Sequence, residues 1–199
     1  MEREVREPKQ ERSIEKKHKI LKAGYELFSN VGYYNTNTAQ IAKQAGVSTG
    51  IVYGYFKDKR DILLDVLAIY VEQAFSPVLE IMDKLEAPIN YYVLAKDVLD
   101  SAIGIHRSNA KIHEALHSMS HCDEEVNNRF IELEDEITLK ISNKLAALGT
   151  DAPNLTERVH FAMDVVQSFS HESIFDNHPY IDYGAMRTIV ENTLVALFI

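Results

Sequence analysis

The side chains best suited to binding chemistry lie between positions 38 and 60, where hydroxyl groups mix with small and basic residues. Thr49, Tyr53 and Tyr55 fall within residues 49–55 (TGIVYGY), and Lys59 follows shortly after. Hydroxyl and ammonium groups donate hydrogen bonds to phosphate oxygens, and an aromatic ring can also pack on the methyl group of thymine. This combination predicts contact with nucleic acid.

The distribution of charge agrees with this prediction. The 199 residues carry a net charge of −9, but residues 1–60 hold 12 Lys and Arg against 7 Asp and Glu. Residues 61–199 hold 9 against 23. A basic segment attracts phosphates, whereas an acidic body is repelled by them. A chance fluctuation in composition would give the same split, so charge alone does not establish a nucleic-acid partner and the motifs are the stronger evidence.

Composition and missing motifs exclude several other classes. Cys122 is the single cysteine, so no internal disulfide forms and a reducing compartment is favoured. Neither a signal peptide nor an apolar run of about 18 residues is present, which predicts a cytoplasmic protein without a membrane partner. The chain has no P-loop, dinucleotide fingerprint, nucleophile elbow or zinc-protease motif. We therefore expect no enzyme activity, cofactor or metal site.

Apolar residues recur at helical spacing along the chain and never alternate as in strands, which predicts an all-α fold. Residues 1–12 are charged and contain Pro8, so we expect a mobile arm. Ser13 is the expected N-cap of a first helix ending near Gly32, and Asp58 opens a long fourth helix that Pro77 kinks or interrupts. The remaining helices are predicted at 39–45 (capped by Thr38), 49–56 (capped by Ser48), 89–107, 110–121, 123–148, 155–176 and 182–198.

Residues 38–56 meet the requirements of a helix-turn-helix. Ala42 is small where two helices approach, and Gly46 suits a turn that needs positive φ. Thr49, Gly50, Tyr53 and Tyr55 are expected on the outer face, free to enter a major groove. An ordinary pair of helices joined by a corner is the alternative. The apolar seam between the two helices is predicted to contain Ile41, Ala45, Val47, Val52 and Phe56.

Residues 16–67 resemble the tetracycline-repressor-like (TetR/AcrR) family of transcriptional regulators. The resemblance lies in the element from Phe28 to Gly32-Tyr33, the turn at 45–48, residues 52–56 (VYGYF) and Lys59. It implies an N-terminal DNA-binding domain followed by a larger helical domain. Many relatives place Lys or Arg at the positions of Thr49 or Gly54, so guanine reading by this helix is in doubt here. The DNA-binding residues that the resemblance implies are Thr38, Thr49, Gly50, Tyr53, Tyr55 and Lys59.

The predicted domains are a helix-turn-helix domain at 13–60 and an effector-binding and dimerisation domain at 61–199. One short recognition helix reads few bases, so we expect a homodimer on a palindromic operator in double-stranded DNA. The expected role is a ligand-responsive repressor. The last two helices are predicted to form the dimer interface through Val159, Met163, Val166, Phe169 and Ser170 of the first and Ile189, Val190, Leu194, Leu197 and Phe198 of the second.

An unknown small-molecule effector is expected to bind within 62–176. Histidines at 113, 117 and 121 share a helical stripe, which leaves a metal sensor as an alternative. Three histidines at this spacing span about 12 Å, too far for all to reach one tetrahedral ion. A helical adaptor without DNA-binding activity is another alternative. The candidate effector-binding residues are Tyr70, Tyr91, Tyr92, His117, Met119, Phe130, Met163, Phe169 and His171.

Overall fold

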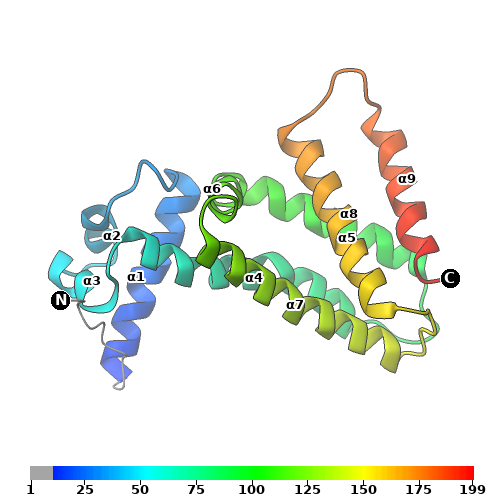
Figure 1. The fold of residues 1–199 in the computed structure, drawn as a ribbon, viewed down its shortest axis with the longest axis horizontal. Coiled ribbons are helices and arrows are strands. Elements are labelled where there is room, and N and C mark those ends of the chain that lie inside the picture. Colours follow the sequence, from blue (N-terminus) through cyan, green and yellow to red (C-terminus); the bar gives the residue numbers. More distant parts are fainter. Residues whose placement is uncertain (1–10) are drawn as a thin grey trace. The chain divides into compact units, whose positions relative to one another are not determined.

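The computed structural model describes residues 11–199, and within this range the chain forms nine α-helices and no strand (Figure 1). The expected all-α fold is therefore confirmed. The helices are α1 (Glu11–Asn30), α2 (Thr38–Gln44), α3 (Thr49–Tyr55), α4 (Lys59–Asp83), α5 (Tyr91–Ser108), α6 (Ala110–Ser120), α7 (Glu124–Ala147), α8 (Leu155–Phe175) and α9 (Tyr183–Ala196).

The chain divides into two compact units. Unit 1 contains the described residues up to Glu72 together with Asn109–Phe130, and unit 2 contains Gln73–Ser108 and Ile131–Ile199. The helix-turn-helix therefore shares its unit with residues 61–72 and 109–130, which the sequence analysis placed in the second domain. Helices α4 and α7 each contribute residues to both units.

Unit 1 packs α1, α2, α3, α6 and the first part of α4 around one apolar centre. Gly24 of α1 lies where α4 passes closest, since a Cβ atom there would be 2.9 Å from Ile62 Cγ2. Tyr25 donates a hydrogen bond of 2.7 Å to Asn109 Oδ1, next to the start of α6. These contacts hold α1 against α4 and against the start of α6. The buried residues include Ile20, Phe28, Ile41, Val52, Phe56, Ile62, Leu63, Leu67, Ile112 and Leu116.

Unit 2 has two apolar clusters. One joins α5, α8 and α9 through Leu99, Phe169 and Leu194. The other joins the last part of α4 to α5, α7 and α8 through Met82, Ile141 and Val159. Every helix of unit 2 therefore buries one face within the unit.

Helix α4 continues through Pro77, where the sequence suggested a kink or an interruption. Its length and apolar composition would also let it cross a membrane. Ile62, Leu63 and Val66 are fully buried in unit 1, however. A core helix of a compact protein meets the same criteria of length and composition, and 39% of the apolar window of α4 is buried within the chain.

Two predicted caps are wrong. Ser13 lies inside α1, which begins at Glu11, so residues 11 and 12 are helical and only 1–10 of the expected arm lie outside the described residues. Asn37 rather than Thr38 caps α2, and Thr38 is the first residue of that helix. Asparagine ranks above threonine as an N-cap, and Gln40 at the N3 position completes a capping box with Asn37, so the local signals favoured Asn37.

Candidate nucleic-acid interface

Local sequence signals define the two outer ends of the α2–turn–α3 motif. The Asn37 side chain accepts a hydrogen bond from the Gln40 N–H, and the Gln40 side chain accepts one from the Asn37 N–H. This reciprocal capping box satisfies two of the unpaired donors at the start of α2. At the end of α3 the Phe56 N–H donates to the Val52 carbonyl at 3.0 Å.

Gly46 makes the turn itself. Its φ is +68°, as the sequence predicted, in the left-handed region that side chains disfavour. The Gly46 N–H donates to the Lys43 carbonyl at 3.2 Å and the Val47 N–H donates to the Ala42 carbonyl at 3.0 Å. These two bonds form a Schellman motif, which ends α2 and directs the chain into Ser48. Ser48 then caps α3, as predicted, by accepting from the Ile51 N–H at 3.4 Å.

The predicted apolar seam is largely buried. Ile41 and Val52 have no exposed surface and Phe56 is 2% exposed, whereas Ala45 and Val47 are half-buried. Lys17 of α1 lies 5.4 Å above the Phe56 ring and forms an ion pair of 2.6 Å with Asp65 of α4. The seam packs α2 against α3, and Lys17 joins α1 to α4 while also contacting Phe56 at the end of α3.

The outer face of α3 presents Thr49, Gly50 and Tyr53, all of which are exposed. The hydroxyl of Tyr53 shares a hydrogen bond of 2.9 Å with Thr38 Oγ1, so two of the predicted residues meet across the motif. Tyr55 differs from the prediction. It is half-buried and its hydroxyl shares a hydrogen bond of 2.7 Å with Ser13 Oγ of α1. Tyr55 therefore faces α1 and not outward, because it lies two residues, about 200°, around the helix from Tyr53.

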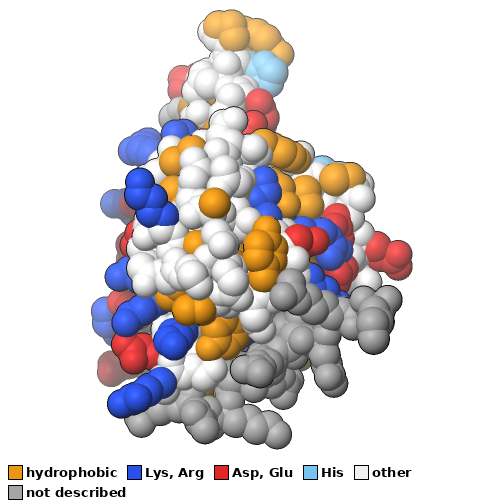
Figure 2. Space-filling model, turned by 90° about the vertical axis from the view of Figure 1, so that its left-hand side faces the viewer, with side chains coloured by type: hydrophobic (Ala, Val, Ile, Leu, Met, Phe, Trp, Pro, Cys, Tyr) orange, Lys and Arg blue, Asp and Glu red, His pale blue; other side chains and the backbone are white. Residues whose placement is uncertain are grey.

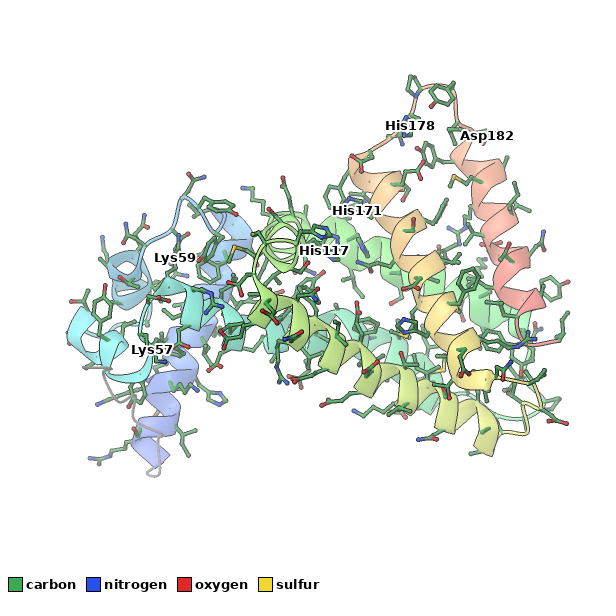
Figure 3. All side chains as sticks on the ribbon, viewed as in Figure 1. Lys57, Lys59, His117, His171, His178 and Asp182 are labelled. Atoms are coloured by element: carbon green, nitrogen blue, oxygen red, sulfur yellow. The ribbon has the colours of Figure 1, made fainter. Side chains whose placement is uncertain are left out.

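Lys59 lies at the first turn of α4 and is already bound within unit 1 (Figure 3). Its ammonium donates a hydrogen bond of 2.8 Å to the Tyr33 carbonyl and lies 4.0 Å from the centre of the Tyr33 ring. Burial lowers the pKa of Lys59 below its ordinary value. A charge held close to the surface in this way can still meet a phosphate, but it also positions the α1–α2 loop.

Two other residues of the basic segment 1–60 are paired with carboxylates within unit 1. Lys17 is paired with Asp65, as described above. Arg60 forms ion pairs with Asp123 and with Glu125, the latter at 2.8 Å. These hydrogen bonds raise the pKa of Arg60 and lower the pKa of Asp123 to about 2. Nothing in the local sequence indicates this pairing, because 63 positions separate Arg60 from Asp123.

Lys16, Lys43 and Lys57 are exposed, and the last two flank α3 in sequence. Figure 2 views the face of unit 1 that carries α2 and α3, and Lys and Arg side chains line one edge of it. The centre of that face is formed mainly by uncharged polar, backbone and hydrophobic atoms. An uncharged reading surface with a basic edge suits a groove between two phosphate backbones.

Four candidate effector residues lie in unit 1. Tyr70 is buried and shares a hydrogen bond of 2.7 Å with His113 Nδ1, and burial raises the pKa of its hydroxyl. The His117 ring lies 4.2 Å from that of His113 and 5.4 Å from that of Phe130. Met119 Sδ accepts from the Tyr34 hydroxyl at 3.9 Å. Tyr70, His117 and Phe130 thus belong to one aromatic cluster around His113.

The other five candidates lie in unit 2, where Tyr91 and Met163 pack against the same apolar cluster. Tyr91 stacks on Phe198, Phe169 belongs to the core, and Met163 contacts Thr138. Tyr92 is exposed, and His171 lies 3.5 Å from Asp176 at the end of α8. Within unit 2, several of these candidates therefore serve packing.

Among residues 11–199, no three His, Cys, Asp or Glu side chains are placed to hold a metal ion. His113 and His117 lie side by side as tilted rings, with His113 bonded to Tyr70. The α5–α6 break expected at 108–109 is present, and it places His106 on a different helix from this pair.

The predicted dimer face of α8 is wrong. Val159, Val166, Phe169 and Ser170 are buried within unit 2, and so are Val190 and Leu194 of α9. The large apolar residues that α8 and α9 leave exposed are Phe161 (51%) and Ile189 (65%). The apolar stripe of each helix faces its own chain, and these two residues lie outside that stripe. Ile189 was among the residues predicted for the dimer interface, whereas Phe161 was not.

Comparison with known proteins agrees with this geometry. Residues 20–66 match the model of the TetR N-terminal domain, described as bacterial regulatory proteins of the tetR family. The transcriptional regulator HbdR of Aromatoleum sp. (strain CIB) is 55% identical over 49 residues, which are 25% of this chain and 21% of HbdR. The fatty acid metabolism regulator protein of Bacillus subtilis is 34% identical over 89 residues, covering 45% of this chain and 42% of that protein. The matches thus span only one to two fifths of these relatives.

Solved structures resemble the fold over nearly the whole chain. A protein described as a TetR-family transcriptional regulator from Mesorhizobium loti has a TM-score of 0.75 at 16% identity, with 94% of this chain and 97% of that one covered. The fatty acid degradation regulator FadR from Bacillus halodurans has a TM-score of 0.64 at 16% identity, with 95% and 97% covered. At this level of identity the likeness establishes the fold alone: an N-terminal helix-turn-helix domain with a larger helical domain.

Proposed function

We propose that this chain, whose residues 20–66 form a TetR-family N-terminal domain, is a cytoplasmic DNA-binding transcriptional regulator. It acts as a ligand-responsive repressor and has no catalytic role. The observation that carries the proposal is the α2–turn–α3 geometry, in which a Schellman turn and two capped helices present one uncharged face. The relatives matched by sequence are transcriptional regulators and not enzymes.

In this proposal α3 enters the major groove and the residues around it bind the phosphate backbones. Thr49, Gly50 and Tyr53 face the bases, while Thr38 and Lys59 meet phosphates from α2 and α4. Lys43 and Lys57 are exposed and add attraction that does not depend on sequence. Tyr55 acts indirectly, by tying α3 to α1 through Ser13.

Two copies of the chain bind one palindromic operator. The exposed Phe161 and Ile189 lie on α8 and α9, and we assign both to the contact between the two copies. A symmetric pair places two α3 helices on successive major grooves, about 34–36 Å apart. Residues 13–60 supply the DNA-binding domain, which we call the reading head. Residues 61–199 supply the dimer contact and the effector site.

A small-molecule effector regulates DNA binding by preferring one of two conformations of the dimer. Such a ligand can change operator affinity only by its difference in affinity for the two states, which is about 1–3 kcal/mol, or 5–150-fold. The test uses compounds that raise the melting temperature of the protein. Operator affinity is measured with and without each compound, and we expect it to change. A set of tightly binding compounds that all leave operator affinity unchanged would exclude the sensor role.

The DNA-binding role is tested by a salt titration of fluorescence anisotropy on a selected operator. Removing one ammonium group that binds a phosphate should reduce the slope of log K against log salt by about 0.9, and a variant dimer loses one such group in each copy, so its slope should fall by about 1.8. We expect this reduction for Lys43→Ala and for Lys57→Ala. Lys140→Ala is the matched control, because Lys140 is equally exposed but lies on α7 in unit 2. Equal slopes for all four proteins would refute the assignment of this face to DNA.

A further inference from the structure

Arg60 carries a second positive charge at the start of α4. It follows Lys59, the residue that we place on a phosphate, and both lie beside Tyr33. The Lys59 ammonium is 4.0 Å from the centre of the Tyr33 ring. Burial is the largest cause of the raised pKa of Tyr33, and Arg60 is close enough to oppose it. Since the Arg60 side chain is 37% exposed, its charge lies next to the place where Lys59 is expected to meet DNA.

Two carboxylates at the start of α7 bind the guanidinium of Arg60. Its Nη2 donates to Asp123 Oδ1 at 2.6 Å, and its Nε donates to the other oxygen of the same carboxylate. Nη2 also lies 2.8 Å from Glu125 Oε2. A planar guanidinium binds a carboxylate and a phosphate in the same forked geometry. The two carboxylates therefore occupy the donors that a phosphate of DNA would use.

Asp123 is well placed to compete with a phosphate. Its Oδ1 accepts from the Glu125 and Val126 N–H groups, so the carboxylate is fixed by the first turn of α7. Hydrogen bonds from Arg60 lower its pKa to about 2, and the group is therefore charged at neutral pH. Glu125 adds a second negative charge on a side chain that is 65% exposed. A phosphate has to displace both groups before it can bind Arg60.

We propose that Asp123 and Glu125 inhibit DNA binding by holding Arg60, and that Arg60 is a further phosphate-binding residue once it is released. The inference rests on the DNA-binding function proposed above and adds a competing contact within the chain. Carboxylate and phosphate compete for one guanidinium, so a movement of the first turn of α7 away from α4 would strengthen DNA binding. The carboxylates thus give α7 an influence on operator affinity.

The experiment removes the two carboxylates and keeps Arg60. Asp123→Asn retains an oxygen that caps α7, and Glu125→Gln retains the shape of the side chain. Anisotropy is measured across a salt titration on one operator, selected for the parent chain from random duplex DNA. For the double variant we expect tighter binding at low salt and a slope of log K against log salt that is steeper by about 1.8, which corresponds to one additional phosphate for each copy of the dimer. The gain in affinity should then shrink about 12-fold between about 50 and 200 mM salt.

Two further variants separate the release of Arg60 from a general loss of negative charge. Adding Arg60→Gln to the double variant should abolish the gain and return the slope to that of Arg60→Gln alone. Glu124→Gln is the matched control, because Glu124 is exposed on the same turn of α7 while Arg60 pairs with the residues on either side of it. It should leave the slope close to that of the parent chain. Circular dichroism verifies that each variant is folded.

Interference by phosphate ethylation locates the new contact on the DNA. The double variant should be sensitive to one more phosphate in each half-site than the parent chain is. That sensitivity should disappear when Arg60→Gln is added, because the guanidinium that makes the contact is then absent.

Several outcomes would overturn the inference. Weaker binding by the double variant would mean that the ion pairs position α4 for DNA, and unchanged binding would mean that they do not compete with it. An equal gain from Glu124→Gln, or a gain that survives Arg60→Gln, would show that net charge alone is responsible. Each of these results leaves the DNA-binding function intact, whereas failure of the parent chain to select any sequence would refute that function itself.

Discussion

Two pairs of helices expose different chemistry, and the difference matches what each has to contact. Helices α2 and α3 have seven residues each and expose hydroxyl groups and glycine backbone on a surface with basic residues nearby. Helices α8 and α9 are 21 and 14 residues long and expose Phe161 and Ile189. Polar, flat surface suits a hydrated groove, whereas large apolar side chains suit a second protein surface.

The two pairs also differ in what holds them. Caps, a Schellman turn and a buried seam fix α2 and α3, because helices this short are marginal without such help. Long helices such as α8 and α9 are instead held by their packing against α5. Local sequence signals therefore determine the conformation of the α2–turn–α3 motif, whereas tertiary contacts determine the positions of α8 and α9.

The largest expected effect comes from breaking the contact between copies. Phe161→Glu combined with Ile189→Glu should leave a folded monomer, because two charges would be buried in each half of the interface. Loss of the linked second half-site should lower operator affinity by 100-fold or more. Sedimentation equilibrium gives the oligomeric state, and anisotropy gives the affinity.

Leu139→Glu is the control for this double variant. Leu139 is 53% exposed on α7 and lies outside the α8–α9 pair, so the same chemical change there should leave the oligomeric state unaltered. A double variant that remains dimeric would show that α8 and α9 do not form the contact between copies. The exposed apolar residues of that pair would then have no assigned partner.

The turn of the reading head provides the next test. Gly46→Ala places a Cβ atom at a φ of +68° and should reduce the free energy of unfolding by about 1–2 kcal/mol. Gly104→Ala is the matched control, since Gly104 lies inside α5 and a Cβ atom there meets nothing within 4 Å. That variant should gain up to about 1 kcal/mol. Urea denaturation of both variants measures the contrast, and a decrease in stability at both positions would contradict it.

The same contrast explains what the sequence could predict. The Gly46 turn, the Ser48 cap and the buried Ile41, Val52 and Phe56 follow from signals within a few residues, so the helix-turn-helix was predictable. Tyr55 was assigned to the wrong face because its partner, Ser13, lies 42 positions away. The pairing of Arg60 with Asp123 and the burial of Val159 and Val166 depend on tertiary packing in the same way. Sequence periodicity identifies an apolar stripe but not the surface that covers it.

A smaller effect should separate stability from binding on α3. Gly54→Ala should raise the free energy of unfolding by up to about 1 kcal/mol, because the added Cβ atom has open space within the chain. Operator affinity should fall severalfold if the backbone approaches DNA at this position. Thermal melts measure the stability and fluorescence anisotropy measures the operator affinity, both on the same preparation. A gain in stability with unchanged affinity would place Gly54 outside the contact surface.

The smallest effect concerns the ion pairs that join the reading head to α7. Asp123 accepts hydrogen bonds from the Glu125 and Val126 N–H groups, so it caps α7 in addition to binding Arg60. Asparagine caps as well as aspartate does, and Asp123→Asn therefore removes the charge while keeping the cap. At pH 7 we expect a decrease of about 0.5–1 kcal/mol in the free energy of unfolding, the range of a partly exposed ion pair.

The dependence of this difference on pH identifies its origin. The pKa of Asp123 is about 2 in the folded chain, below the ordinary value of 3.8. The carboxylate therefore stabilises the fold fully above its ordinary pKa, and this contribution is lost as the pH falls through about 2. Urea denaturation at pH 7, 5 and 3 should show parent and variant beginning to converge at the lowest pH. Adding Arg60→Gln to the Asp123→Asn variant should reduce stability little further, because the ion pair with Asp123 is already lost and the remaining partner, Glu125, is exposed. A difference that persists unchanged to pH 3 would mean that the charge of Asp123 is not its origin, because the asparagine variant keeps the cap.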